Sequence, residues 1–456
     1  MFCSMSHRAR CIHERVTRLI ACGYAFVTLL NAPRAAHANG RYPKADQLQI
    51  APDDPRFLAV RTTFGLLLSR DSGQNWDWVC ERAIGYSGVQ DPTLGLMRGG
   101  TLIASLSEGI ARSPDRGCNW AFSEADLGES PVIDLTVRQA GATQALALVW
   151  DAQQLGYSSR ILASVDDGRT FLPYGTPIDP AVLVTTIDVA PSDPHRVYAS
   201  GTRSADGVRS ALLFSSEDDG QHWSEHQLPF DPKLEQGVYI AAVDPQDADT
   251  VYLRTSSATV GRLLVTHDAG EHASAVYSGS LLSFALSPDG KQLYFGGEDG
   301  LHAGLARDSK FEQRASIRVL CLAATTDTVY ACSDEHSGFT IGASTDGGLS
   351  FEPLLHLETV RGPLSCSAAE CETDWPVVRA QLGIPLPTEA DAGAAADAGA
   401  TGSGGSPAAQ VTPKGSCAVA FGDASSTLTW QALLLATLGQ LSRRRRSRLR
   451  SRLPAK

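Results

Sequence analysis

Short apolar runs alternate with polar turns over most of the chain, from about residue 46 to residue 360. Runs such as residues 65–68, 161–163 and 211–214 lead into a polar turn, after which another apolar segment begins. This order predicts strand, tight turn and strand. No helical apolar period long enough for a core helix occurs before residue 370, whereas residues 375–382 predict one short helix. We therefore expect an all-β fold.

Six of the turns share the pattern Ser/Thr-x-Asp-x-Gly-x-x-aromatic, with alanine in place of the aromatic residue in the fifth copy. We call it the acidic turn motif, and its copies are residues 69–76, 113–120, 164–171, 216–223, 266–273 and 344–351. Glycine permits the positive φ of a tight turn, and aspartate can accept hydrogen bonds from backbone N–H groups two or three residues later. The aspartates to which we assign this structural role are Asp71, Asp115, Asp166, Asp218, Asp268 and Asp346.

The aromatic residue that ends the motif is expected to bury its ring between neighbouring sheets. The rings are those of Trp76, Trp120, Phe171, Trp223 and Phe351. A cation bound in each turn is the alternative interpretation of the motif. One carboxylate per turn is a poor cage for Ca²⁺, which takes six to eight oxygen ligands, so we expect no metal.

The motif spacing predicts the number of repeats. One gap, between residues 266 and 344, is about twice the shorter spacings, and residues 306–311 fit there as a decayed copy. A second recurring segment contains Pro and Asp, as in residues 50–55 and 189–194, and predicts a turn between two further strands. Four strands per repeat is typical of a propeller blade. We predict a single β-propeller of seven four-stranded blades, with six blades as the alternative.

Over roughly residues 46–360 the motifs resemble the Asp-box (BNR) repeats of sialidase-like β-propellers. The resemblance implies that the motifs lie on the rim away from the binding face, so that other loops form the mouth of a site. Sialidases carry one catalytic arginine in an aromatic-Arg-Ile-Pro stretch. Gly40-Arg41-Tyr42-Pro43 matches this stretch in part, because it lacks the preceding aromatic residue and the Ile. No pair of carboxylates stands out by spacing. We assign no catalytic residue and no cofactor. A sialidase-like glycoside hydrolase is the alternative, with Arg41 and other arginines beside a Tyr and a Glu.

Both ends of the chain resemble sorting signals. Residues 1–38 combine arginines, an apolar run and the small-x-small site Ala36-His-Ala38, which predicts a signal peptide cleaved after Ala38. The end of the chain combines Cys417, a short apolar run and an arginine cluster, and resembles the MYXO-CTERM type of sorting tail. That resemblance implies processing near Cys417 and display at the cell surface, associated with the outer membrane, with an extracellular location as the alternative. A basic tail for nucleic acid is the alternative.

These segments divide the chain into five parts. We expect a signal peptide (1–38), a propeller (39–362), a disulfide-closed extension with a short helix (363–384), a disordered linker (385–416) and a sorting tail (417–456). The first and last parts carry net charges of +4 and +7, so the body between them carries −22. Such a surface repels phosphate backbones, and we expect no nucleic-acid partner and membrane contact only through the tail.

Six cysteines remain in the body, an even number that predicts three disulfides in an exported protein. They are Cys80, Cys118, Cys321, Cys332, Cys366 and Cys371. We expect the pairs Cys80–Cys118, Cys321–Cys332 and Cys366–Cys371, among fifteen possible pairings. Free buried thiols are the alternative.

Rigid repeats, export signals and the missing catalytic set favour a binding or scaffold module. We expect a monomer that binds a polysaccharide or a surface protein at its axial face. Trp150 and Tyr157, which flank the longest insertion, are candidate ligand contacts. Tyrosines recur near the blade strands, where they are either half-buried strand residues or the lining of the central funnel; they are Tyr198, Tyr239, Tyr252, Tyr294 and Tyr330.

Overall fold

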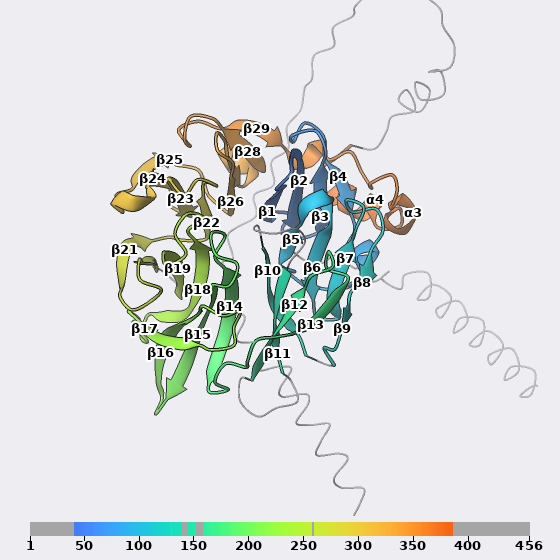
Figure 1. Cartoon of the computed structure of the whole chain (residues 1–456). Helices are drawn as coiled ribbons and strands as arrows, with labels where there is room; N and C mark the ends of the chain where they lie inside the picture. The colour runs from blue at the N-terminus through green and yellow to red at the C-terminus, as the bar shows by residue number, and fades with distance from the viewer. Residues whose placement is uncertain (1–40, 129, 139–144, 152–157, 258–259, 386–456) are drawn as a thin grey trace, which may run out of the picture. The chain divides into compact units, whose positions relative to one another are not determined.

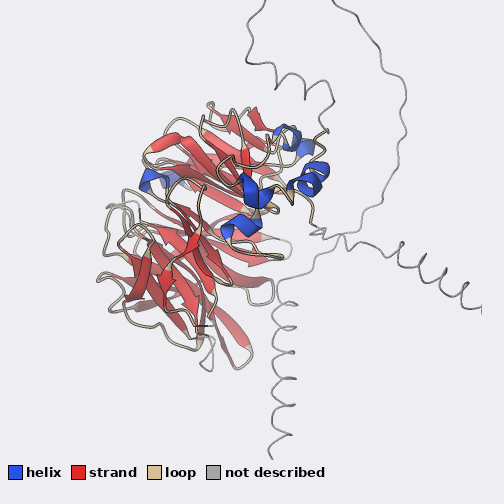
Figure 2. Cartoon of the chain, turned by 90° about the vertical axis from the view of Figure 1, so that its right-hand side faces the viewer, coloured by secondary structure: helices blue, strands red, loops and turns tan. Residues whose placement is uncertain are grey.

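Seven antiparallel sheets form a ring around a central axis (Figure 1). The computed structural model describes residues 41–385 except 129, 139–144, 152–157 and 258–259. Each sheet comes from one continuous stretch of chain, and its four blade strands follow one another from the axis outward, with a fifth, parallel strand added at the outer edge of one sheet. The structure is thus a seven-bladed β-propeller, as predicted, and the six-bladed alternative is wrong. Figure 2 shows that strands make up almost all of the ring.

The first four blades contain the strands up to Leu228. Blade 1 is β1 (Ala45–Ala51), β2 (Asp54–Thr62), β3 (Gly65–Ser69) and β4 (Asp77–Val79). Blade 2 is β5 (Leu94–Leu96), β6 (Leu102–Leu106), β7 (Gly109–Ser113) and β8 (Ala121–Phe122). Blade 3 is β10 (Val132–Val137), β11 (Ala145–Trp150), β12 (Ser159–Ser164) and β13 (Thr170–Tyr174), with β9 (Glu124–Ala125) pairing in parallel to β13. Blade 4 is β14 (Val182–Val189), β15 (Val197–Ala205), β16 (Val208–Ser216) and β17 (Ser224–Leu228).

The last three blades follow the same plan. Blade 5 is β18 (Glu235–Val243), β19 (Val251–Ser257), β20 (Gly261–Thr266) and β21 (Ala273–Gly279). Blade 6 is β22 (Ser283–Leu286), β23 (Gln292–Gly297), β24 (Gly300–Leu305) and β25 (Glu312–Ala315). Blade 7 is β26 (Cys321–Ala324), β27 (Val329–Cys332), β28 (Ile341–Ser344) and β29 (Glu352–Leu355). The helices are one turn or two long: α2 (Glu81–Ile84), α3 (Ala368–Cys371) and α4 (Trp375–Gln381).

The antiparallel order gives the ring two different faces. Turns between first and second strands, and between third and fourth strands, lie at one end of each blade, because successive antiparallel strands run in opposite directions. The acidic turn motifs join third and fourth strands, so we call this end the motif face. The connections between blades lie at the opposite face.

Side chains at bulges in the inner strands link neighbouring blades. The register of β10 shifts between Val132 and Asp134, and that of β14 shifts between Val184 and Thr186. Asp134 Oδ2 accepts a 3.0 Å hydrogen bond from the backbone N–H of Ile187 in blade 4. Thr186 Oγ1 likewise accepts a 2.9 Å bond from a backbone N–H of blade 5. A bulge re-aims a side chain out of the regular pleat, which here joins one sheet to the next.

The ring is closed by a segment that follows the last blade. In Figure 1, blade 7 lies beside blade 1, and β26 contacts β1. Residues 360–371, which we call the closing strap, then run along the outer strand of blade 1. Trp78 donates its backbone N–H to Gly362 at 2.7 Å, and Leu364 donates to Trp78 at 2.8 Å. The indole of Trp375 lies 5.5 Å from that of Trp78, centroid to centroid. The strap thus adds a partner to the edge of blade 1.

Two disulfides fix the strap to the first two blades, and this corrects two expected pairings. Cys371 pairs with Cys80 of blade 1, and Cys366 pairs with Cys118 of blade 2. Neither Cys80–Cys118 nor Cys366–Cys371 forms, because the strap lies against these blades instead of folding on itself. The third pair, Cys321–Cys332, joins opposite residues of β26 and β27 as predicted.

The long-range disulfides should contribute more stability than the local one. They span 291 and 248 residues, against 11 for Cys321–Cys332, and closing a longer loop removes more entropy from the unfolded chain. Replacing Cys80 and Cys371 together by serine should cost about 4–5 kcal/mol, against about 3 kcal/mol for the double serine variant of the local pair. Denaturant unfolding of both variants measures the difference, and equal losses would contradict this role of the strap.

Candidate functional site

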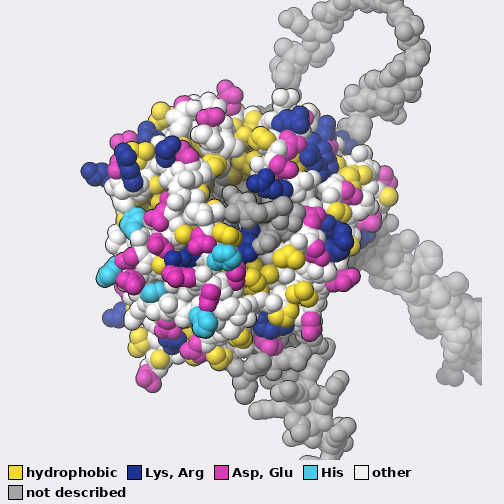
Figure 3. All heavy atoms as spheres, viewed as in Figure 1, with side chains coloured by type: hydrophobic (Ala, Val, Ile, Leu, Met, Phe, Trp, Pro, Cys, Tyr) yellow, Lys and Arg dark blue, Asp and Glu magenta, His cyan; other side chains and the backbone are white. Residues whose placement is uncertain are grey.

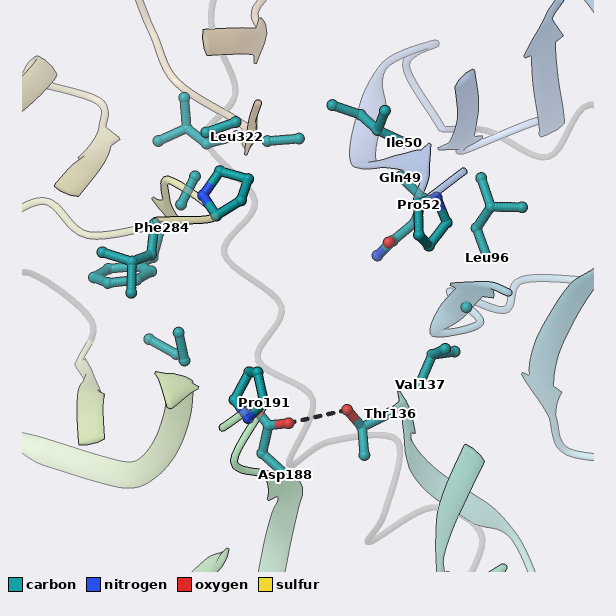
Figure 4. A pocket seen from close by; sticks show the side chains of 18 of the residues that line it. Gln49, Ile50, Pro52, Leu96, Thr136, Val137, Asp188, Pro191, Phe284 and Leu322 are labelled. Carbon is teal, nitrogen blue, oxygen red and sulfur yellow. Dashed lines mark hydrogen bonds between the residues drawn. The ribbon is translucent and has the colours of Figure 1, made fainter. Parts of the chain in front are cut away.

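A cavity of about 400 Å³ lies on the axis of the ring, and all seven innermost strands line it (Figure 4). These strands are β1, β5, β10, β14, β18, β22 and β26. The lining continues into turns between first and second strands, where Pro52, Pro191, Pro245 and Pro288 form part of it. The cavity therefore lies toward the motif face, whereas the resemblance placed the mouth of a site at the other loops.

Most side chains that line the cavity are aliphatic, but the lining exposes more polar than apolar surface. Several of these aliphatic side chains, such as those of Leu94 and Leu96, are themselves buried between blades. Phe284 is the one aromatic residue that lines it within the described chain. The larger apolar lining residues are otherwise Leu48, Ile50, Leu94, Leu96, Leu135, Val137, Val189, Val243, Leu286 and Leu322. Ala241, Ala242 and Ala323 leave room on the walls of blades 5 and 7. Ligand pockets combine apolar walls with a small number of polar groups, and this cavity exposes more polar surface than that general pattern.

Two glutamines of β1 bring polar groups to the cavity from blade 1. Gln47 is fully engaged with the next blade, because its amide donates to the carbonyl of Leu94 and accepts from the N–H of Leu94, both at 2.9 Å. The amide of Gln49 projects into the cavity in Figure 4 and has no hydrogen-bond partner among the described residues. Gln47 is thus a structural link, whereas Gln49 is available to a ligand.

Asp188 is the single charged side chain that lines the cavity within the described chain. Its Oδ1 accepts a 3.1 Å hydrogen bond from Thr136 Oγ1 of blade 3, as Figure 4 shows, and a 2.8 Å bond from the backbone N–H of Val189. The side chain is half-buried. Burial raises the pKa of Asp188 above its ordinary range, because a carboxylate loses hydration there.

A second group of charged residues stands behind the lining. Burial likewise raises the pKa of Asp134, and the nearby negative charge of Asp188 adds to the shift. The guanidinium of Arg254 lies over the ring of Tyr239, 4.9 Å from its centroid, in the neighbouring strands β18 and β19. Burial lowers the pKa of Arg254. The sequence analysis did not single out Asp134, Asp188 or Arg254.

The acidic turn motifs form closed hydrogen-bond systems outside the cavity lining. In blade 1, Ser69 Oγ donates to Asp71 Oδ1 at 2.9 Å and accepts from the N–H of Gly73 at 2.8 Å. Asp71 Oδ1 also accepts from the N–H of Asn75 at 2.9 Å. In blade 1 the backbone donor lies four residues after the aspartate, whereas in blade 7 the N–H of Leu349, three residues after Asp346, donates as expected at 3.0 Å. The motif therefore ties its own turn together.

The second oxygen of each motif aspartate is occupied as well. It accepts a hydrogen bond from the side chain four residues later in all six copies. These donors are Asn75, Asn119, Thr170, His222, His272 and Ser350. The motif as we defined it from the sequence did not specify this position, although it carries a hydrogen-bonding side chain in all six copies. A carboxylate with both oxygens bonded inside its own turn has little capacity left for a ligand.

The residue between aspartate and glycine reaches the preceding blade. In blades 3 and 4 it is an aspartate with positive φ, Asp167 and Asp219. Asp167 Oδ2 accepts a 2.6 Å bond from Arg112 of blade 2, and Asp219 Oδ1 accepts a 2.5 Å bond from the hydroxyl of Tyr174 of blade 3. These acids of the motif face connect blades.

The motif aromatic residues also join the blades. Trp76 and Phe171 are fully buried, whereas Trp120, Trp223 and Phe351 are half-buried. The indole N–H of Trp76 donates to carbonyls of Gly73 and of Leu354 in blade 7. Blade 1 is thus also held to blade 7 by its motif.

In blade 5, the motif brings together three potential metal ligands. Asp268, Glu271 and His272 place ligand atoms within 4.8 Å of one another. His272 Nδ1 lies 2.7 Å from Asp268 Oδ2, which is the same contact that the other five motifs make with a neutral side chain or His222. The geometry is therefore accounted for by the turn itself.

The candidate aromatic contacts do not line the cavity. Trp150 ends β11, and its indole N–H donates to the carbonyl of Val184 in blade 4 at 2.8 Å. Tyr157 lies outside the described residues, as do Ala38 and Cys417. None of the five strand tyrosines is among the described lining residues. Tyr198, for example, is buried and donates its hydroxyl to the carbonyl of Ala248.

Arg41 is paired away from the cavity. Its guanidinium lies 2.6 Å from Asp91 Oδ1 in the connection between blades 1 and 2. Arg61 donates to the backbone carbonyls of Asp91 and Pro92 in the same connection. Burial raises the pKa of nearby Tyr86. Among the described residues no arginine, tyrosine or glutamate lines the axial cavity, where the hydrolase alternative would gather them.

Comparison with known proteins supports the fold and no more. No family model and no curated protein matches the chain. An ancestral GH74 enzyme is similar to 69% of this chain and 46% of its own, with 10% identity and a TM-score of 0.50. The hydrazine synthase of Kuenenia stuttgartiensis matches 69% of this chain and 99% of its own, with 10% identity and a TM-score of 0.49. The chain spans less than half of the GH74 enzyme.

The motif aspartates predict how stability depends on pH. Hydrogen bonds from the side chain and backbone of His222 lower the pKa of Asp218 to about 2, against about 3.9 in an unfolded chain. Its contribution to stability is present above about pH 4 and is lost as the pH falls toward 2. We expect Asp218→Asn to be less stable than the parent protein at neutral pH, with the difference shrinking below pH 4.

Urea unfolding midpoints between neutral pH and about pH 2 measure this difference. Asp327→Asn is the matched control, since Asp327 is an exposed turn residue of blade 7 outside the motifs. A gap between Asp218→Asn and the parent that stays constant down to low pH would show that Asp218 plays no such part.

Proposed function

We propose that this protein is an exported binding module that holds an extended segment of a protein ligand in its axial cavity. The observation that carries the proposal is the cavity itself, to which all seven blades contribute a wall. Disulfides and hydrogen bonds between blades hold the ring together and give the cavity fixed walls. A ligand therefore binds without the entropy cost of ordering these walls.

The composition of the wall favours a protein ligand over a polysaccharide. Sugar rings commonly stack on aromatic side chains, and Phe284 is the one aromatic lining residue described. The half-buried side chains of Ile50, Val137 and Leu286, with the polar surface between them, instead suit the mixed apolar and polar groups of a peptide. A cavity of about 400 Å³ holds a few side chains, so the rest of a protein partner would lie on the motif face.

Export is supported by the covalent structure. Three disulfides fit an oxidising compartment. Within the described part of the chain, no helix is both long and apolar enough to cross a membrane. We infer that residues 1–38 direct export and that the segment from Cys417 onward directs display at the cell surface.

Filling the cavity should abolish binding. Ala242→Trp and Ala323→Trp each place an indole on the cavity wall. Peptides selected from a phage-displayed library on the purified protein should lose affinity for both variants by roughly tenfold or more, which corresponds to at least about 1.4 kcal/mol. Fluorescence anisotropy with labelled peptides measures the affinities.

Leu172→Trp is the matched control, because Leu172 is exposed on the outer strand of blade 3. It should bind the peptides as tightly as the parent protein, and unchanged melting temperatures verify that all three variants fold. Peptides that bind the filled variants equally well would contradict the axial site, and binding of glycans from an array without any peptide hit would contradict the ligand class.

The sorting proposal has its own test. The exported protein should begin at Asn39, which mass spectrometry of its N-terminal peptide determines. Cys417→Ala should release the protein from the cell surface into the medium, because the processing site is lost. Equal surface display of Cys417→Ala and of Cys3→Ala, a control within the signal peptide, would contradict a role for Cys417.

A further inference from the structure

The carboxylate of Asp188 is only half used by the protein. Thr136 and the N–H of Val189 both donate to Oδ1. Oδ2 accepts no hydrogen bond from the described residues, and Asp188 forms no ion pair with any of them. An asparagine could accept the same two bonds through its single carbonyl oxygen. The link between blades 3 and 4 therefore does not require the negative charge.

The surroundings of Asp188 provide no direct counter-charge. On β10, Thr136 is neutral and Asp134 carries a charge of the same sign. On β18 and β19, the guanidinium of Arg254 lies over the Tyr239 ring and interacts electrostatically with Asp134. The other cavity walls are neutral. A carboxylate in such a place is costly unless a cation joins it.

The turns around the cavity add further negative charge. Five first-to-second-strand turns carry an aspartate beside the lining residues: Asp53, Asp193, Asp247, Asp289 and Asp327. Basic groups on these turns are partly neutralised, since Lys291 pairs with Asp289 and Arg196 pairs with Glu217 and Asp249. Arg98 on blade 2 and His195 on blade 4 also lie there. Figure 3 shows acidic side chains spread over the ring.

We propose that the cavity selects a cationic ligand group, the ammonium of a lysine or the guanidinium of an arginine, which pairs with Oδ2 of Asp188. This inference rests on the proposed function and specifies the ligand that the axial cavity takes. The aliphatic stem of the cationic side chain lies along aliphatic side chains of the lining, such as Val137, and the Gln49 amide on the opposite blade binds a carbonyl or hydroxyl of the ligand. The acids on the turns attract the cationic partner toward the mouth.

Two probes of equal length separate the charge from the apolar contact. n-Hexylammonium and 1-hexanol share the alkyl chain and differ in the cationic head group. At about pH 7.5, we expect the parent protein to bind the ammonium roughly tenfold more tightly than the alcohol, as measured by ligand-observed NMR titration. Asp188→Asn should remove this preference by weakening ammonium binding alone. Asp327→Asn, which removes an equal charge outside the cavity lining, should retain most of it.

The preference should also fall as the pH is lowered from about 7.5 to about 4.5, because protonation of Asp188 removes the charge that pairs with the ligand. Asp134 titrates in the same direction, and His195 at the mouth, whose pKa is raised by its bond to Asp219, gains positive charge as the pH falls. Asp134→Asn and His195→Gln are therefore measured alongside, and both should keep a pH-dependent preference. Unchanged melting temperatures establish that the variants fold.

The outcomes distinguish the two proposals. If both probes bind with equal affinity, or if Asp188→Asn still prefers the ammonium, then the cavity is a binding site but the charge inference is wrong. If neither probe binds at about 10 mM, a concentration suited to weak ligands, both the axial site and the inference fail. If Asp327→Asn loses the preference for the ammonium as completely as Asp188→Asn does, the preference comes from the overall negative charge of the motif face and the inference about Asp188 is wrong.

Discussion

The structure depends on closing the ring. Each blade is a continuous stretch of chain, so no strand of the described residues is exchanged between the first and the last blade. The junction instead relies on packing of β26 against β1, on the Trp76 indole that bonds to Leu354, and on the closing strap. The strap leaves blade 7, pairs with the edge of blade 1 and is bonded covalently to blades 1 and 2. Because the cavity walls come from all seven blades, the geometry of the site depends on this junction.

The acidic turn motifs explain much of the negative charge without assigning it to function. Each motif aspartate accepts bonds from its own turn at both oxygens, and the intervening Asp167 and Asp219 bond to the preceding blade. These carboxylates are therefore structural groups that remain partly exposed to solvent. Asp188 differs from them because one oxygen bonds to protein groups and the other does not. The distinction between a structural and a functional acid lies in this accounting of hydrogen bonds.

The sequence predicted features that depend on local interactions. The motif spacing gave seven blades because every motif is a turn of one hairpin, and the decayed copy near residue 306 marks blade 6 correctly. Cys321 and Cys332 could be paired because they lie opposite each other in adjacent strands. Cys366 and Cys371 could not, because their partners depend on where the strap lies after the ring closes. No local pattern contains that information.

The sequence did not predict the cavity, because the cavity also depends on closure of the ring. Repeated motifs mark the turns of the blades, whereas the inner strands share only short apolar runs, and their lining residues meet only in the closed ring. A weak signal did exist. Both Asp134 and Asp188 follow an isoleucine inside an apolar strand, where an acid is out of place unless its environment compensates for the charge. The alternation of the strand gave no means to tell which acid faces a neighbouring blade and which one the axis.

The closed ring resolves this ambiguity through the bulges of the inner strands. The bulge in β10 turns Asp134 toward the backbone of blade 4, where Ile187 N–H satisfies Oδ2. Asp188 lies past the bulge of β14, where the strand again follows the regular register, and it lines the cavity. Two similar Ile-Asp pairs thus have different surroundings. A cavity that combines aliphatic side chains with a carboxylate whose second oxygen lacks a protein donor is complementary to a cation on an aliphatic stem.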